Sequence, residues 1–228
     1  MSLLLGARGK DFVVLMTDGF SLRTSDKGTT LENGDLKKLF QIGDRPCVIA
    51  HHGQNELGAV KVGSVLTNPV FQKVQASAWA RGLNVAMARA VTRLDSSVSQ
   101  TLKSSPAGNL FGLWFAGFWP CTANPEITEL VWQHSGNNRV RTAMMPHKEL
   151  VIGGGGLKHL REFLGRPIDD EFSAGKIMAS PVEYSMALVK RLYEIAAERQ
   201  ASAGEKIFGG TRQMAVITRD GVDLGPMD

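Results

Sequence analysis

Short apolar runs separated by polar turns dominate the beginning of the chain. Residues 3–7 and 12–17 are mainly aliphatic, and the four residues between them read Arg-Gly-Lys-Asp. Residues 38–42 and 47–50 repeat this arrangement around a segment that contains glycine and proline. Runs of this length between turn-forming residues are typical of β-strands. The pattern therefore predicts two β-hairpins near the N-terminus.

Longer segments in the middle of the chain have helical periodicity. We expect helices over residues 54–68 and 75–103, the second of which repeats apolar residues at near-helical spacing. Residues 109–119 and 126–134 then return to the composition of strands. An aromatic cluster in the first of these strands is expected to fill a core between sheets: Phe111, Trp114, Phe115, Phe118 and Trp119. Trp79 and Trp132 have no clear assignment.

The last third of the chain is predicted to contain two helices and a closing strand. Residues 156–164 fit a short helix, and the closing strand covers residues 212–218. Between them, Ser180-Pro181-Val182-Glu183 matches a capping box with proline at the first helical position, which opens a helix to about residue 201. This order of strands and helices predicts an α+β fold in which helices cover the outer faces of sheets.

Composition is that of an ordinary globular protein, with 43% apolar and 21% charged residues in a chain of 228. No internal repeat, low-complexity tract or linker interrupts the chain, so one domain over residues 1–228 is expected. The opening apolar run is three leucines long, too short for a signal peptide, and no run approaches the roughly 18 apolar residues of a membrane span. We expect a soluble, cytoplasmic protein.

A net charge of +4 and a pI near 9.2 raise the question of nucleic-acid binding. The basic residues are scattered and form no run of five, so we predict no nucleic-acid partner. The two cysteines, Cys47 and Cys121, have neither metal-binding nor redox spacing and form no disulfide framework. No motif predicts a cofactor or a metal.

Three polar residues near the N-terminus, Ser2, Asp18 and Lys38, are candidates for catalysis. Once Met1 is removed, the hydroxyl of Ser2 has a free α-amine beside it, and that amine can act as its base without a histidine. An α-amine titrates near pH 7.7–8.0, close to working pH. Lys38 would stabilise negative charge on the hydroxyl oxygen, and Asp18 would hold Lys38 in place. Each residue alone also has an ordinary structural explanation, so the prediction rests on their conjunction.

Several segments around these residues resemble proteasome β-type subunits. Residues 2–18 look like the two opening strands of that family, and residues 37–42 resemble its lysine strand. Residues 113–117, 151–156 and 214–221 are similar to its central strand, glycine turn and closing hairpin. The resemblance spans nearly the whole chain, and it is more specific at the ends than over residues 55–110.

The resemblance implies a four-layer αββα sandwich of two antiparallel sheets, the fold of N-terminal nucleophile hydrolases. It implies a threonine-protease-like peptidase in which Ser2 replaces the usual threonine and Asp18 and Lys38 are catalytic. It also implies a homo-oligomeric ring or double ring that degrades unfolded proteins or peptides, with a possible separate ATPase unfoldase as partner. No membrane partner is implied.

Some positions depart from the family pattern around this triad. Proteolytic members carry a serine in the glycine turn and an aspartate after the last helix, where this chain has Gly154 and approximately Gln200. Ser202 is a candidate to replace one of these hydrogen-bonding residues. By alignment, His51 stands where a glycine backbone N–H forms the oxyanion hole.

Two other functions remain open. The first is a catalytically silent ring subunit with a structural role, which the departures at Gly154 and Gln200 would fit. The second is an amidase or ligase that uses Ser2 on a small molecule or one defined peptide.

Three further motifs favour structural explanations. Residues 28–30, Gly-Thr-Thr, resemble a cleavage point in family precursors, but cleavage there would discard Asp18. Residues 153–156 lack the Gly-Lys-Ser/Thr ending of a phosphate loop. The adjacent His51 and His52 point to opposite sides of a strand and have no spaced ligand partner.

Overall fold

The computed structural model contains two five-stranded sheets in which every pair of neighbouring strands is antiparallel. The first sheet has the order β12 (Leu150–Gly154), β1 (Leu3–Arg8), β2 (Val13–Thr17), β13 (Arg212–Thr218) and β14 (Gly221–Met227). The second has the order β11 (Val140–Met144), β10 (Glu126–Gln133), β9 (Leu110–Gly117), β6 (Cys47–Gly53) and β5 (Leu39–Gln41). The structure describes residues 2–25, 28–57, 60–103, 110–120, 122–133, 140–144, 148–163 and 166–227.

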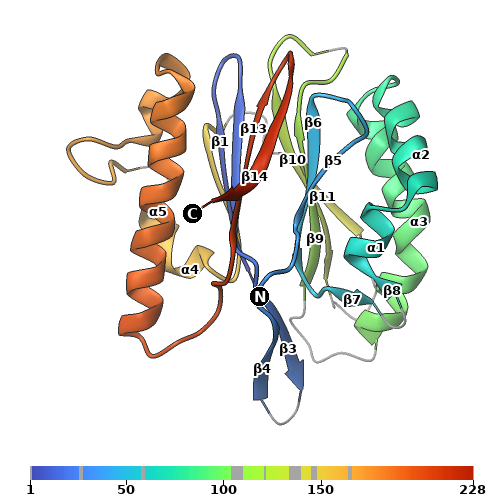
Figure 1. The fold of residues 1–228 in the computed structure, drawn as a ribbon, viewed down its shortest axis with the longest axis horizontal. Coiled ribbons are helices and arrows are strands. Elements are labelled where there is room, and N and C mark those ends of the chain that lie inside the picture. Colours follow the sequence, from blue (N-terminus) through green and yellow to red (C-terminus); the bar gives the residue numbers. More distant parts are fainter. Residues whose placement is uncertain are drawn as a thin grey trace.

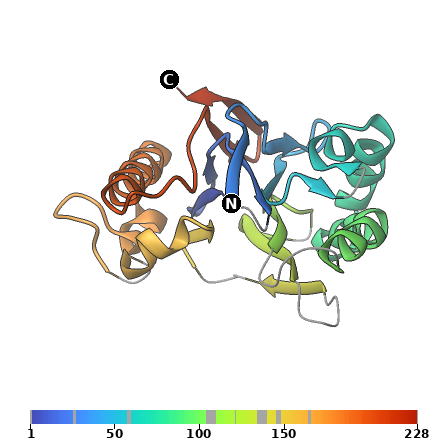
Figure 2. The ribbon, with the colours of Figure 1, turned by 90° about the horizontal axis from the view of Figure 1, so that it is seen from below.

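Helices flank the two sheets on opposite sides, so the molecule has four layers (Figures 1 and 2). On the side of the first sheet lie α4 (Leu157–Leu160), η1 (Arg161–Phe163), η2 (Ala174–Ala179) and α5 (Val182–Ser202). On the side of the second sheet lie α1 (Val62–Leu66), α2 (Pro69–Trp79) and α3 (Leu83–Lys103). The predicted α+β class is confirmed, with helices on the outer faces of antiparallel sheets.

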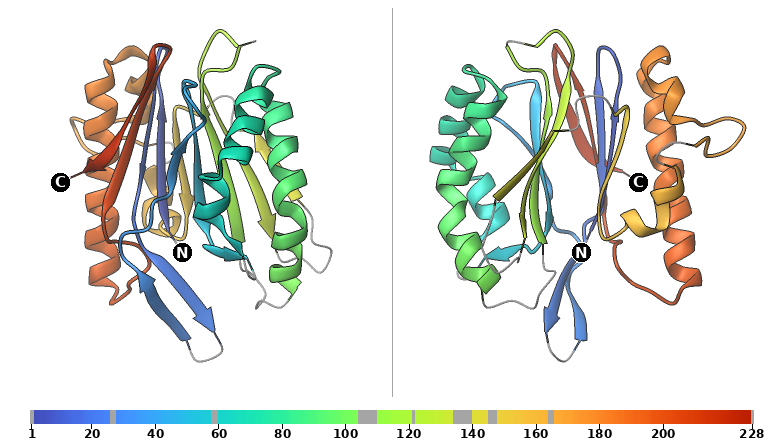
Figure 3. Two further views of the ribbon diagram at one scale, coloured as in Figure 1. Left: turned by 45° about the vertical axis from the view of Figure 1, so that its right-hand side comes forward. Right: turned by 180° about the vertical axis from the view of Figure 1, so that it is seen from behind.

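Two small hairpins extend this framework. One consists of β3 (Ser21–Ser25) and β4 (Gly28–Asn33), and it projects beyond the sandwich near the N-terminus (Figure 3). The Gly-Thr-Thr motif of residues 28–30 begins β4. The other hairpin pairs β7 (Glu56–Leu57) with β8 (Val60–Lys61). Neither hairpin was predicted, because their short strands lack an apolar run.

Three apolar cores separate the four layers. Leu4, Leu15, Val48, Trp114 and Ile217 belong to the core between the sheets. A second core joins the first sheet to α4 and α5, and a third joins the second sheet to α1, α2 and α3. The first sheet is therefore buried on both faces, which explains why all five residues of β2 are buried.

The aromatic residues around β9 do not lie in one core, as predicted, but in two. Trp114 and Phe118 face the core between the sheets, whereas Phe111, Phe115 and Trp119 face α1–α3. Successive side chains of a strand point to opposite faces, so residues two or four positions apart share a face. Of the two unassigned tryptophans, Trp79 donates to the carbonyl of Phe118 at 2.8 Å, and Trp132 donates to Asp95 at 3.1 Å.

The predicted helices in the middle of the chain need correction. Within residues 54–68 only α1 is helical, because the β7–β8 hairpin occupies residues 56–57 and 60–61. The predicted helix 75–103 is two helices, and the chain turns between them at Gly82, whose φ is +104°. The first of these begins earlier than predicted, at Pro69, because Asn68 caps it by accepting hydrogen bonds from the N–H groups of Val70 and Phe71.

The predicted capping box before α5 is also wrong. Pro181 is the N-cap of α5, with no side-chain cap hydrogen bond, and the helix begins at Val182. The strand predicted at residues 47–50 continues to Gly53 as β6. The other described boundaries agree within two residues, and β13 matches its predicted range. The predicted strand ends at Asn109 and His134, and the predicted helix end at Leu164, lie outside the described residues.

Among the described residues, none of the helices combines the length and the apolar character needed to cross a bilayer.

Candidate active site

The three predicted catalytic residues come together because each lies at the end of a strand. Ser2 directly precedes β1, and Asp18 directly follows β2. These strands are antiparallel, with Leu4 opposite Thr17, so the start of one is beside the end of the other. Lys38 directly precedes β5 in the second sheet. The site therefore lies at one end of the sandwich, where both sheets contribute to it.

Lys38 joins the other two side chains. Its Nζ donates to Oγ of Ser2 at 3.1 Å and to Oδ1 of Asp18 at 2.9 Å. All three residues are buried, with exposed fractions of 1% for Ser2, 0% for Asp18 and 1% for Lys38. A buried ammonium group next to a hydroxyl is an arrangement that stabilises negative charge developing on oxygen.

Burial lowers the pKa of Lys38 below that of an exposed lysine, and the charge and hydrogen bond of Asp18 oppose this shift only in part. The ammonium form of Lys38 therefore depends on Asp18. Removing that carboxylate would leave a buried lysine whose charged form has no compensating partner.

The carboxylate of Asp18 is fixed by the backbone as well as by Lys38. Oδ1 accepts from the N–H of Leu3 at 3.0 Å, while Oδ2 accepts from Phe20 at 3.1 Å and from Gly209 at 3.2 Å. Three N–H donors and one ammonium group therefore satisfy this buried charge. The contact with Leu3 ties the carboxylate to the residue that follows Ser2.

Close backbone packing behind Asp18 requires glycine at position 19. A Cβ on Gly19 would lie 2.5 Å from the carbonyl oxygen of Gly34 and 2.8 Å from that of Thr211. The N–H of Gly19 donates to Gly209, and its carbonyl accepts from Leu36. The Asp18-Gly19 dipeptide is thus more than a turn signal. The missing side chain of Gly19 lets the backbone at residues 34–36 and 209–211 pack against the backbone next to Asp18.

Gln213 links the two sheets at Lys38. It lies on β13 of the first sheet, opposite Thr17, and its Oε1 accepts from the backbone N–H of Lys38 at 2.9 Å. Its Nε2 donates to the carbonyl of Leu36 at 2.6 Å. The sequence reasoning missed this residue, because nothing in the pattern of β13 distinguishes it from other polar strand positions.

Gln200, which stands where the family pattern has an aspartate, holds the loop behind the site. Its Oε1 accepts from the N–H groups of Ile207 and Phe208, and its Nε2 donates to the carbonyl of Phe208 at 2.9 Å. The next residue, Gly209, donates to Asp18. Gln200 therefore acts on the site through the loop that carries this donor.

Ser202 does not take part in the hydrogen-bond network described around Ser2. Its side chain is exposed near the end of α5, and its hydroxyl donates to the carbonyl of Glu198 within the helix. The suggestion that it replaces a family residue beside the nucleophile gains no support from this position.

Gly154 lies directly against Ser2. Its φ is +78°, and a Cβ there would lie 2.2 Å from the carbonyl oxygen of Ser2. The carbonyl of Ser2 also accepts from the N–H of Gly156 at 3.1 Å. The serine that the family pattern has in this turn would not fit this backbone, so Gly154 positions Ser2 by close approach alone.

The backbone N–H of His51 is not free to form an oxyanion hole, because it donates to the carbonyl of Lys38 at 3.1 Å. This N–H instead holds the backbone of Lys38 in place. The predicted role of His51 as an oxyanion donor is therefore wrong. The ring is 1% exposed and stacks on Phe40, with a centroid distance of 6.1 Å. Burial, together with the nearby charges of Lys38 and His52, lowers the pKa of His51 to about 3, so the ring is neutral.

His52 points to the other side of β6. Its Nε2 lies 2.8 Å from Oε1 of Glu129, which also accepts from Nε1 of Trp114 at 3.1 Å. Burial alone would raise the pKa of Glu129, but these two contacts outweigh it and the net shift is downward. His52 thus has the structural role expected of it.

Cys47 is buried, and burial raises the pKa of its thiol. Cys121 and Met1 lie outside the described residues.

No protein-family model matches the chain, and no curated protein matches it either.

Proposed function

We propose that this chain is a subunit of a proteasome-type N-terminal nucleophile hydrolase, in which Ser2 attacks peptide bonds. The observation that carries the proposal is the contact of Lys38 Nζ with both Ser2 Oγ and Asp18 Oδ1 in a buried cluster. The two antiparallel sheets between helical layers support the αββα fold that the resemblance implies.

Activity requires cleavage of the peptide bond before Ser2. The α-nitrogen of Ser2 is then an amine rather than an amide, and only an amine can accept a proton from the hydroxyl. An amide nitrogen cannot take this role, so without cleavage the hydroxyl of Ser2 has no base of its own.

The proposed cycle has two steps. The Oγ of Ser2 forms a bond to the substrate carbonyl carbon while its proton passes to the α-amine of Ser2. That proton then moves to the departing substrate nitrogen as the C–N bond breaks, which leaves an ester on Ser2. A water molecule gives a proton to the α-amine and attacks the ester, and the Ser2 hydroxyl is restored as the acid leaves. Lys38 stabilises the charge on Oγ, and Asp18 keeps Lys38 protonated.

By resemblance, the subunits assemble into homo-oligomeric rings that enclose the sites, so the substrates are unfolded chains. A separate ATPase would supply the energy of unfolding. We infer a cytoplasmic location on the same basis.

The activity of Ser2 variants on a fluorogenic peptide and on a denatured protein tests this proposal. Ser2→Ala removes the nucleophile and should reduce kcat by about a thousandfold or more. Ser2→Thr keeps the hydroxyl and should retain activity. Equal rates for wild type and Ser2→Ala would overturn the proposal that Ser2 is the nucleophile of a peptidase. Activity on small amides but not on denatured protein would assign Ser2 to an amidase or ligase.

A silent ring subunit is the second candidate. Gly154 and Ser202 favour it, because neither places a hydroxyl beside Ser2 as proteolytic family members do. An assembled protein that lacks activity even after the N-terminus is trimmed to Ser2 would favour this candidate.

A further inference from the structure

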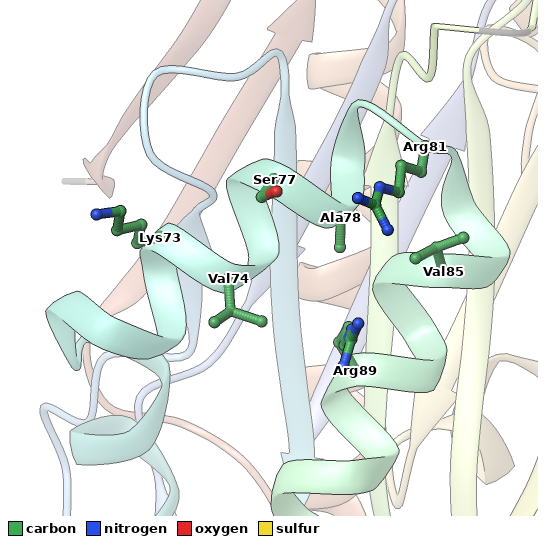
Figure 4. Close-up of a pocket in the computed structure, with 7 residues that line it drawn as sticks. All are labelled: Lys73, Val74, Ser77, Ala78, Arg81, Val85 and Arg89. Carbon is green, nitrogen blue, oxygen red and sulfur yellow. The ribbon is translucent and has the colours of Figure 1, made fainter.

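The outer surface of α2 and α3 carries a groove that the proposed activity does not use. Two adjoining hollows of about 410 and about 300 Å³ share Val74 and Arg89 among their lining residues. Figure 4 shows the larger one, with Val74 and Val85 projecting from neighbouring helices and Arg81 and Arg89 beside them. The shared residues make the two hollows one continuous groove.

The groove exposes aliphatic side chains. Val70 is 72% exposed and Val74 is 41% exposed, and the two lie one helical turn apart on α2. Single exposed aliphatic residues are common, but two neighbours beside a concave surface form a patch. Phe71, which is itself buried, lines the smaller hollow together with these two valines.

Four cationic side chains surround these valines: Lys73, Arg81, Arg89 and Arg93. No acidic residue lines either hollow. The sequence of α2 contains no aspartate or glutamate, and the single acidic residue of α3, Asp95, accepts a hydrogen bond from Trp132. Within the described parts of the chain, no ion pair neutralises the four cations.

We propose that this groove binds an acidic amphipathic peptide segment of a partner protein. Aliphatic side chains of the segment would cover Val70 and Val74, while its carboxylates would pair with the surrounding cations. A nucleic acid would use the cations but not the valines, because single strands stack their bases on aromatic side chains. A membrane surface is a poorer fit, because lipid binding places a convex apolar face into the bilayer and this patch is concave.

Fluorescence anisotropy with the full chain tests the proposal. The probe is a labelled synthetic peptide with leucines at i and i+4 flanked by glutamates, and its control replaces every glutamate by glutamine. We expect the glutamate peptide to bind, with affinity that falls as salt is raised, and the glutamine peptide to bind about tenfold more weakly or worse.

Charge reversals on opposite helix layers locate the binding site. Lys73→Glu in the groove should weaken binding of the glutamate peptide by about tenfold, and Arg89→Glu, which affects both hollows, by more than that. Lys190→Glu is the matched control, because it makes the same change at an exposed position on α5. Val74→Ser should weaken binding by a smaller factor and leave its salt dependence unchanged. Circular dichroism establishes that each variant is folded.

Several results would overturn the proposal. These are the absence of binding by the glutamate peptide, equal binding of the two peptides, and equal losses in Lys73→Glu and Lys190→Glu. Tighter binding of a single-stranded oligonucleotide or of anionic vesicles, with the same dependence on Arg89, would assign the groove to a nucleic acid or a membrane surface instead.

Discussion

The two helical layers of this protein handle their charges in opposite ways. In the layer of α4 and α5, Arg199 bonds to Glu162 and to the carbonyl of His159, and Arg191 lies near Glu194 and Asp169. In the layer of α2 and α3, the cations around the groove have no acidic neighbour among its lining residues. These two arginines of the first layer have acidic partners, whereas the cations around the groove are available to another molecule.

The layers also differ in their relation to Ser2. Gln200 of α5 holds the loop whose Gly209 donates a hydrogen bond to Asp18. Burial raises the pKa of Tyr193 on the same helix, and the negative charge of Asp18 raises it further. The groove, by contrast, is lined mainly by residues of α2 and α3. These two helices belong to the opposite helical layer (Figure 1). We therefore expect substitutions around Ser2 to affect stability and activity, and substitutions around the groove to affect neither strongly.

The largest effect is expected when Lys38 is replaced. Lys38→Ala leaves Asp18 buried without its cation, so we expect a loss of about 3–5 kcal/mol in the free energy of unfolding and loss of activity. Lys73→Ala, at an exposed position of the other layer, should change stability by less than about 0.5 kcal/mol. Urea denaturation measures the stability of both variants, and a peptide-cleavage assay measures the activity of Lys38→Ala.

A double variant separates stability from catalysis. Asp18→Asn with Lys38→Met removes both charges, so it should recover part of the stability lost in Lys38→Ala but none of the activity. Recovery of activity would contradict the role given to Lys38.

The second effect concerns pH. Asp18 raises the pKa of Lys38 against the larger effect of burial, so Asp18→Asn should lower that pKa further. The active ammonium form is then lost at lower pH, and the alkaline limb of the kcat/KM profile should move downward. An unchanged limb would mean that Lys38 does not act as a cation in the reaction.

The same group affects stability with a definite sign. Between the lowered pKa of folded Lys38 and its ordinary value of 10.5, the unfolded chain binds more protons than the folded one. Stability contributed by Lys38 therefore increases as pH rises through this window. Asp18→Asn should widen the window towards lower pH, as urea denaturation at several pH values would show.

Loss of the loop contact should have an intermediate effect. Gln200→Ala leaves buried donors of Ile207 and Phe208 unpaired, so we expect a loss of about 1–3 kcal/mol in stability and a lower kcat. Ser202→Ala, on the same helix, removes only an exposed bond to Glu198 and should alter neither. Equal kcat values in the two variants would show that the loop does not position Asp18.

The smallest effect is expected from neutralising one arginine in each layer. Arg199→Gln breaks a half-exposed ion pair with Glu162 and should lower stability by about 0.2–1 kcal/mol, less at high salt. Arg89→Gln removes repulsion from neighbouring cations and should leave stability unchanged or slightly raised. Thermal unfolding at two salt concentrations distinguishes the two variants, because only Arg199→Gln should show a loss of stability that becomes smaller at high salt.

The sequence predicted those parts of the molecule that depend on local patterns. Apolar runs indicated β1, β2, β6 and β13, and the order of Ser2, Asp18 and Lys38 predicted a contact that the structure shows. The break at Gly82 was missed because apolar periodicity continues on both sides of it. The β7–β8 hairpin was missed because its strands are two residues long.

The supporting residues of the site were beyond local reasoning. Gln213 meets Lys38 across 175 positions of sequence, and Gly209 meets Asp18 across 191. No sequence pattern predicts either contact, since the first depends on how the two sheets face each other and the second on the pairing of β2 with β13 within one sheet. His51 failed as an oxyanion donor for a similar reason, because the pairing of its N–H with Lys38 is set by the register of β5 and β6.

Intact-mass spectrometry of untagged protein from cells, before and after an inhibitor that captures both hydroxyl and α-amine, tests the central claim most directly. We predict a mass that begins at Ser2 and gains one inhibitor equivalent, with the adduct mapped to Ser2. A retained Met1 with no adduct would contradict the N-terminal nucleophile and leave the structural ring subunit as the better account.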